Sequence, residues 1–263
     1  MSYRPRWFSG FLLAGLGLAV TTVVVIIAAQ IAYAGERDSP FSALGEPDVR
    51  AAVRLSLWTA TLAAVLAMVV AIPAAYALAR WRFRGRILID ALLDIPIVLS
   101  PIVVGIALIL VFRSQPGKWI EDHLVRFVFE VPGIVIAQFV LALAMQIRVL
   151  KAGFEDLNPR YEQVARFMGC TPFEAFRRVT LPMCRSSLIA AFVMGWSRAL
   201  SDFGATVTIA GSVRNKTETI PIAIYNNLAS VQIGKALGLA LLMTAIALCV
   251  LVVLRVLARR REP

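Results

Sequence analysis

The sequence is poor in the residue types on which most enzymes and metal sites depend. Its 263 residues include a single histidine, and nothing in the arrangement of its acidic residues supports a membrane enzyme. The odd number of cysteines, Cys170, Cys184 and Cys249, indicates free thiols rather than a disulfide framework. The phosphate-binding pattern G-x-x-x-x-G-K-[ST] is missing, because neither Gly-Lys pair is followed by Ser or Thr. We therefore expect no catalytic residue, no metal and no cofactor bound by this chain.

Apolar residues, in contrast, dominate the chain. They make up 59% of it, and the mean hydropathy is +0.78, which is more than a soluble domain of this size needs. A bilayer takes about 20 apolar residues per helix, so the long apolar runs predict transmembrane helices. The net charge of +11 would suggest nucleic acid in a soluble protein, but here it indicates arginines gathered on one membrane side. We predict an all-α polytopic membrane protein without a nucleic-acid partner, with six spans at about 11–34, 55–79, 87–112, 132–150, 183–210 and 235–257.

Lysine and arginine are distributed unevenly between the two sides of this arrangement. The side that carries both termini and the loop between the fourth and fifth spans holds nearly twice as many of them as the other side. The positive-inside rule makes this side cytoplasmic, in the inner membrane. We interpret the basic run Arg80, Arg82, Arg84 and Arg86 as a topology anchor.

The first apolar run has a second interpretation. Ala32-Tyr33-Ala34 fits a signal-peptide cleavage site, which would remove the run from the mature protein. The run is longer than the roughly 7–15 apolar residues of a signal peptide, so we expect the helix to be retained.

A polar and basic segment, Gln163–Pro182, separates the fourth and fifth spans. Gly169 can adopt positive φ, so one helix can end there and another begin. Thr171 is a predicted N-cap with Pro172 at the first helical position, and Glu174 completes a capping box. The segment is therefore predicted to fold as helix, glycine turn and second helix before the chain re-enters the membrane.

The spacing of this segment resembles the cytoplasmic EAA loop of ABC importer permeases, whose pattern is E-A-A-x3-G-x9-I-x-L-P. Gln163, Val164 and Val179 depart from the pattern, whereas the spacing from the glycine to Leu-Pro is kept. In that family the loop forms a coupling helix that inserts into a cleft of the ATPase subunit. The alternative is an ordinary amphipathic loop whose aromatic residues pack against the ends of its own spans. The resemblance implies an ATPase-coupling role for Gln163, Ala165, Arg166, Phe167, Gly169, Thr171, Phe173, Phe176, Leu181 and Pro182.

The fifth predicted span contains two charged residues, Arg198 and Asp202. They are four residues apart, so they share one face of a helix and can pair. Charges within a span are costly and usually face a bundle interior or a water-filled cavity. One interpretation is a structural ion pair, and the other is that the pair borders a translocation path. For the path we select Ser197, Arg198, Ser201, Asp202 and Thr206, although hydroxyls within spans more often bond their own backbone.

The stretch RALSDFGATVTIAG and the later TETIPIAIYNNL resemble the molybdate, tungstate and sulfate branch of these permeases. The resemblance covers roughly residues 50–255. It implies the type I ABC importer permease fold, a homodimer, two ATPase subunits that bind ATP, and a periplasmic or lipid-anchored protein that delivers the oxyanion. Transport would then proceed by alternating access driven by the ATPases.

We divide the chain accordingly into an N-terminal helix and outer loop at 1–50, a permease domain at 51–258 with its coupling loop at 155–182, and a basic tail at 259–263. Two other functions stay open. One is an ABC permease for a different small solute. The other is an ion-coupled secondary transporter, for which the chain offers few intramembrane acids.

Overall fold

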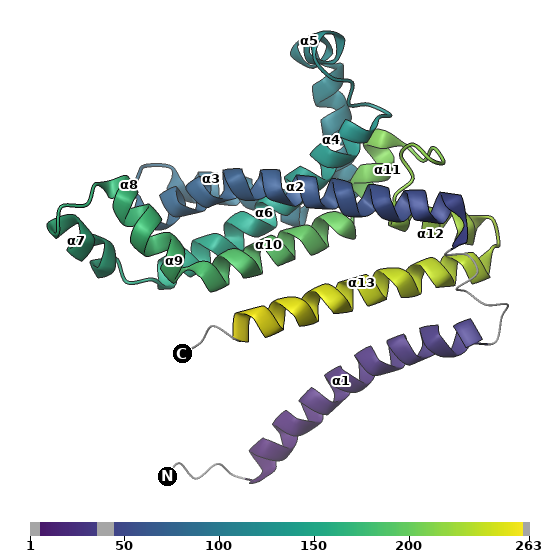
Figure 1. Cartoon of the computed structure of the whole chain (residues 1–263), viewed down its shortest axis with the longest axis horizontal. Coiled ribbons are helices and arrows are strands. Elements are labelled where there is room, and N and C mark those ends of the chain that lie inside the picture. The colour runs from purple at the N-terminus through teal and green to yellow at the C-terminus, as the bar shows by residue number, and fades with distance from the viewer. Residues whose placement is uncertain (1–5, 36–44, 260–263) are drawn as a thin grey trace.

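The structure, a computed structural model, describes residues 6–35 and 45–259 (Figure 1). All regular secondary structure in this part of the chain is helical, which confirms the predicted all-α class. The elements are α1 (Arg6–Gly35), α2 (Pro47–Arg80), α3 (Arg86–Val98), α4 (Pro101–Arg113), α5 (Gln115–His123), α6 (Val131–Asp156), α7 (Arg160–Phe167), α8 (Pro172–Ala175), the π-helix η2 (Phe176–Thr180), α9 (Leu181–Met183), α10 (Arg185–Leu200), α11 (Gly204–Ala210), α12 (Ile220–Ala229) and α13 (Ile233–Arg259).

Three helices, α2, α6 and α10, pack side by side and form the centre of the bundle (Figure 1). The inner face of α2 is a stripe of buried alanines, Ala60, Ala63, Ala64, Ala67, Ala71 and Ala75. Small residues let helix backbones approach closely, which is the usual basis of helix association in a bilayer. Against this stripe pack larger side chains of the other two helices, such as Leu150 and Phe154 of α6 and Trp196 of α10. The remaining helices surround this core, with α13 beside α10 and α1 outermost.

Within residues 6–35 and 45–259, four helices are long and apolar enough to cross a membrane, and two bent pairs bring the number to six if each pair counts as one span. The predicted third span is not continuous: α3 and α4 meet at a bend of 112°. The predicted fifth span is interrupted twice, by a bend of 74° before α10 and by the non-helical residues 201–203 between α10 and α11. The sequence predicted one span at each of these places but did not reveal the bends.

The interruptions allow α4 and α11 to pack closely against each other. A Cβ atom on Gly105 of α4 would lie 2.7 Å from Cβ of Thr208, and one on Gly204 of α11 would lie 3.0 Å from Ile102 Cγ1. A side chain at Gly105 would therefore clash with α11, and one at Gly204 would need its neighbours on α4 to shift slightly. Hydropathy alone could not reveal this contact, because it joins residues far apart in the sequence.

Several predicted boundaries also shift. The second span begins at Pro47, inside the predicted outer loop, and the fourth continues to Asp156, so the loop that follows starts later than residue 155. Two predicted loops contain short helices, α5 and α12. Residues 36–44 of the first outer loop and 260–263 of the basic tail lie outside the described residues.

The two ends of the bundle carry different elements. Figure 1 shows α7 and α8 at the left end, toward which the start of α1 and the end of α13 also point. The start of α2 and all of α12 lie at the opposite end. The segment between the fourth and fifth spans thus lies at the same end of the bundle as the described ends of the chain.

Candidate functional site

The segment from α7 to η2 folds as the sequence predicts. The first helix ends at Phe167, and Gly169 follows with φ +94°. The Thr171 side chain accepts a hydrogen bond from the Glu174 N–H at 3.2 Å, and the Thr171 N–H donates to Glu174 Oε2 at 2.8 Å. These two bonds form the predicted capping box and start α8 with Pro172 in its first turn. A hydrogen bond from the Thr171 backbone N–H lowers the pKa of Glu174 below its usual value, and a bond from the Thr171 hydroxyl adds a smaller effect in the same direction.

The outward side of this segment is apolar and basic. Phe167 is 90% exposed, and Met168 and Phe173 are also exposed. An open hollow of about 630 Å³ lies beside them, lined by Gln163, Arg166, Phe167, Cys170 and Pro172. Large apolar side chains that gather on one exposed surface typically mark an interaction site. Of the predicted coupling residues, seven are exposed: Gln163, Arg166, Phe167, Gly169, Thr171, Phe173 and Pro182.

The other predicted coupling residues face the protein. Phe176 packs against Tyr76, with 4.5 Å between ring centroids, and belongs with Leu181 to the core around α2 and α6. Ala165 is buried as well. The packing of aromatic residues against the chain's own spans, which the sequence left as an alternative, is therefore correct for Phe176, whereas Phe167 and Phe173 remain on the surface.

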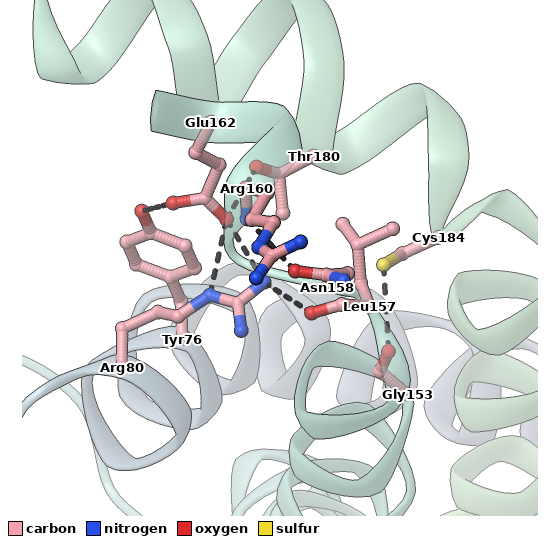
Figure 2. A network of polar contacts seen from close by, with 9 residues as sticks. All are labelled: Tyr76, Arg80, Gly153, Leu157, Asn158, Arg160, Glu162, Thr180 and Cys184. Carbon is pink, nitrogen blue, oxygen red and sulfur yellow. Dashed lines mark hydrogen bonds and ion pairs between the residues drawn. The ribbon is translucent and has the colours of Figure 1, made fainter. Parts of the chain in front are cut away.

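Sequence reasoning missed Glu162, which connects this segment to other helices. Its carboxylate accepts hydrogen bonds from Tyr76 Oη at 2.9 Å, Arg80 Nε at 3.0 Å and Thr180 Oγ1 at 2.9 Å (Figure 2). Arg80 also donates to the Leu157 carbonyl at 3.0 Å. The only signal in the sequence was an acidic residue directly before Gln163, where the EAA pattern begins.

Two arginines of the basic run have contacts beyond the anchoring role that the sequence predicts. Arg80 is an interior residue of the network around Glu162, with its side chain 11% exposed. Arg86 forms an ion pair with Glu155 at 2.8 Å, which joins the start of α3 to the end of α6. Both arginines therefore hold helices together at this end of the bundle. Their partners are distant in sequence, so spacing along the chain could not reveal them.

The second candidate region is the break between α10 and α11. Arg198 Nη1 lies 3.7 Å from Asp202 Oδ1, so the predicted ion pair forms. The prediction that both residues lie on one continuous helix was wrong, because α10 ends at Leu200. Asp202 lies in the break, where its Oδ2 accepts hydrogen bonds from Thr206 N at 2.9 Å and Thr206 Oγ1 at 2.8 Å. Asp202 thereby caps the start of α11.

The residues selected for a path surround this break, but they differ in exposure. The Arg198 side chain is 28% exposed, whereas that of Asp202 is fully buried. Ser201 is exposed and donates to the Arg198 carbonyl at 3.3 Å, as expected for a hydroxyl that bonds its own backbone. Ser197 is half-buried, and Thr206 is buried with its hydroxyl bonded to Asp202. Ser201, which is exposed, and Arg198, whose side chain is partly exposed, are therefore the residues of this set that we consider further for a path.

Comparison with known proteins places the chain among bacterial transport proteins. The sulfate transport system permease protein CysW of Synechocystis is 32% identical over 224 residues, covering 84% of this chain and 81% of the relative. The sulfate transport system permease protein CysT of Escherichia coli is 31% identical, covering 81% of this chain and 78% of the relative. The molybdenum transport system permease protein ModB of Haemophilus influenzae is 32% identical, covering 66% and 78%.

The fold matches that of a solved transporter. A chain in the crystal structure of a bacterial ABC transporter involved in the import of the acidic polysaccharide alginate aligns with a TM-score of 0.76 at 17% identity, covering 98% of this chain and 96% of that one. Residues 67–263 match the family model described as the inner membrane component of binding-protein-dependent transport systems. The chain therefore belongs to the family of inner membrane components of binding-protein-dependent transport systems.

Proposed function

We propose that this chain forms the transmembrane path of an ATP-driven importer for an oxyanion of the molybdate, tungstate or sulfate class. The names of its relatives support this class of solute. Its relatives are permease proteins, so the chain is a transport subunit and not an enzyme. ATP would bind to a partner subunit, and a periplasmic binding protein would deliver the anion.

The observation that carries the proposal is the exposed surface of α7 and α8. Phe167, Met168 and Phe173 project from the end of the bundle beside the hollow lined by Gln163 and Arg166. Buried aromatic anchors dominate the energy of many protein interfaces, and a basic rim fits an acidic partner surface. We assign this surface to the ATPase, in a complex with one ATPase subunit for each permease copy.

Motion would pass from the ATPase to the membrane through this surface. ATP binding closes the two ATPases and draws the two coupling segments together, and the central path then turns outward. Hydrolysis and release reset the path inward. The permease is thus a bistable element whose equilibrium is biased by a nucleotide on another chain.

Arg198 is the residue that we assign to the anion. Its guanidinium is partly exposed in the last turn of α10, and Asp202 beside it is buried. A guanidinium presents several N–H donors in one plane, which suits a tetrahedral oxyanion. Asp202 would keep the site close to neutral when no anion is present.

We also propose a second copy of the chain and an orientation. No residue of α3 is buried in the single chain, and its large side chains Ile87, Leu88 and Val98 are exposed. Lipid and a second permease copy would together cover such apolar faces. The uneven distribution of lysine and arginine supports an orientation with both termini and α7 in the cytoplasm.

The test is co-purification of the ATPase with variants of the exposed aromatic residues. The double variant Phe167→Ala, Phe173→Ala should insert normally but lose most of the bound ATPase, because it removes both anchors. Trp119→Ala is the matched control, since Trp119 is an exposed aromatic residue on α5, away from α7. Full retention of the ATPase by the double variant would contradict the docking surface.

A further inference from the structure

Glu162 differs from its neighbours on α7 in the direction of its side chain. Tyr161 and Gln163 are exposed on either side of it, whereas the Glu162 side chain is 14% exposed. An ionised carboxylate only accepts hydrogen bonds. Both of its oxygens are used: Oε2 accepts from Tyr76, and Oε1 accepts from Arg80 and Thr180 (Figure 2).

The donors belong to two other elements of the fold. Tyr76 and Arg80 lie one helical turn apart in the last two turns of α2. Thr180 is the last residue of η2 and is fully buried, immediately before the chain enters α9. A single carboxylate thus connects α7 to α2, some 80 residues earlier in the chain. It also connects α7 to the end of η2, from which the chain continues through α9 into α10.

Arg80 extends the connection to a third helix. Its Nη2 donates to the carbonyl of Leu157, which follows the last turn of α6. The Tyr76 ring packs edge-on against Phe154 of α6, at 5.7 Å, and against Phe176 of η2. Polar and aromatic contacts therefore meet at one point, where α2, α6, α7 and η2 come together.

We propose that Glu162 is the positioning residue that joins the coupling segment to α2, so that a displacement of α7 moves the membrane helices with it. Along the chain itself, α7 is connected to the membrane helices only through non-helical points, the loop 157–159 and the turn at Gly169. Without the carboxylate, movement of α7 would be absorbed at these points. The inference rests on the proposed function, because it requires that a partner displaces α7.

The proposal separates the two faces of α7. The outward face binds the partner, and the inward face passes on the movement. Loss of Glu162 should therefore leave ATPase binding intact and reduce the transport obtained from each ATP. A residue that merely stabilised the fold would lower uptake and ATP hydrolysis together, through loss of folded protein.

The first experiment compares Glu162→Gln and Glu162→Ala with Glu155→Gln in the reconstituted complex. Glu155 is the matched control, because it also pairs with an arginine at this end of the bundle but is 42% exposed and lies on α6, outside the α7–η2 segment. Uptake of radiolabelled sulfate and molybdate is measured together with ATP hydrolysis. We expect uptake per ATP to fall about tenfold or more in the Glu162 variants, the equivalent of one charge-assisted hydrogen bond, and less than about twofold in Glu155→Gln.

The second experiment measures the joint directly, in the permease without its partner. Spin labels at the exposed positions Trp81 and Met168 report the distance between the end of α2 and the end of α7, in a chain whose three cysteines are replaced by serine. The distance distribution should be narrow with Glu162 and broad with Glu162→Gln. Tyr76→Phe, which removes one donor and little volume, should give an intermediate width.

Either experiment can overturn the proposal. Unchanged uptake per ATP, or a label distance that stays narrow in both Glu162 variants, would show that α7 is positioned by other contacts. A wild-type complex that fails to bind an ATPase would refute the proposed function instead, and the label distance would still test the joint. If Glu162→Ala does not fold, Glu162→Gln and Tyr76→Phe give the same decision.

Discussion

Two regions of this molecule each hold a carboxylate beside an arginine, and they use the pair differently. In the α7–η2 segment, Glu162 accepts hydrogen bonds from three side chains and its arginine bonds to it at 3.0 Å. At the break between α10 and α11, one oxygen of Asp202 is bonded to Thr206, and the other lies 3.7 Å from Arg198. Both side chains of the Arg80–Glu162 pair are largely buried, whereas the Arg198–Asp202 pair leaves its arginine partly exposed.

The difference indicates what each region can do. A carboxylate whose acceptor sites are filled by donors from several helices fixes those helices relative to one another. A buried carboxylate that caps a short helix and leaves a guanidinium partly exposed can hold positive charge at a place that a solute can reach. We therefore assign the α7–η2 segment to transmission and the break between α10 and α11 to the anion.

Asp202 gives the largest expected effect on stability. Asp202→Ala removes Oδ2, which accepts both hydrogen bonds from Thr206, and also removes the partner of Arg198. Each buried donor that is left unsatisfied typically costs about 1–3 kcal/mol. Asp202→Asn keeps an oxygen that can accept from Thr206, so it should lower the free energy of unfolding much less. Thermal unfolding of the two variants in detergent gives the comparison. Equal loss in both variants would mean that the charge, not the cap at α11, is what Asp202 contributes.

Gly169 gives a smaller effect on stability and a large one on coupling. Gly169→Val places a β-branched residue at φ +94°, which costs about 1–3 kcal/mol of strain. Gly85→Val is the matched control, because Gly85 has φ +88° and neither glycine has an atom within 4 Å of an added Cβ. Both variants should insert into the membrane, but only Gly169→Val should lose bound ATPase and uptake, as measured by co-purification and radiolabelled sulfate. The same loss in both would indicate general backbone strain instead of a role in coupling.

Local features of the fold could be predicted from the sequence. The turn at Gly169 and the capping box of Thr171 and Glu174 depend on residues within a few positions of each other, and both are present in the structure. The apolar runs gave the membrane helices for the same reason, since length and composition are properties of one segment.

The breaks and the network around Glu162 could not be predicted in this way. The breaks next to α4 and α11 accompany the close approach of Gly105 to Thr208 and of Gly204 to Ile102, which are residues far apart in the sequence. Glu162 depends on donors from α2, and no periodicity or motif spacing links residues so far apart in the chain. Sequence reasoning found the charged residues within the membrane because they are rare there. It missed the pair of Arg80 and Glu162 because arginines at the end of a span are common.

The central claim, an anion path driven by ATP on another chain, is tested most directly by uptake into sealed vesicles. Vesicles that contain the permease, its ATPase and the binding protein should take up radiolabelled sulfate or molybdate when ATP reaches the ATPase side. They should take up none under a proton or sodium gradient alone. The Arg198→Ala chain should bind its ATPase normally and lose roughly 10- to 100-fold of the uptake, as expected when a charged hydrogen bond to the anion is removed. Uptake by the permease alone, driven by an ion gradient without ATP, would contradict the account and identify the chain as a secondary transporter.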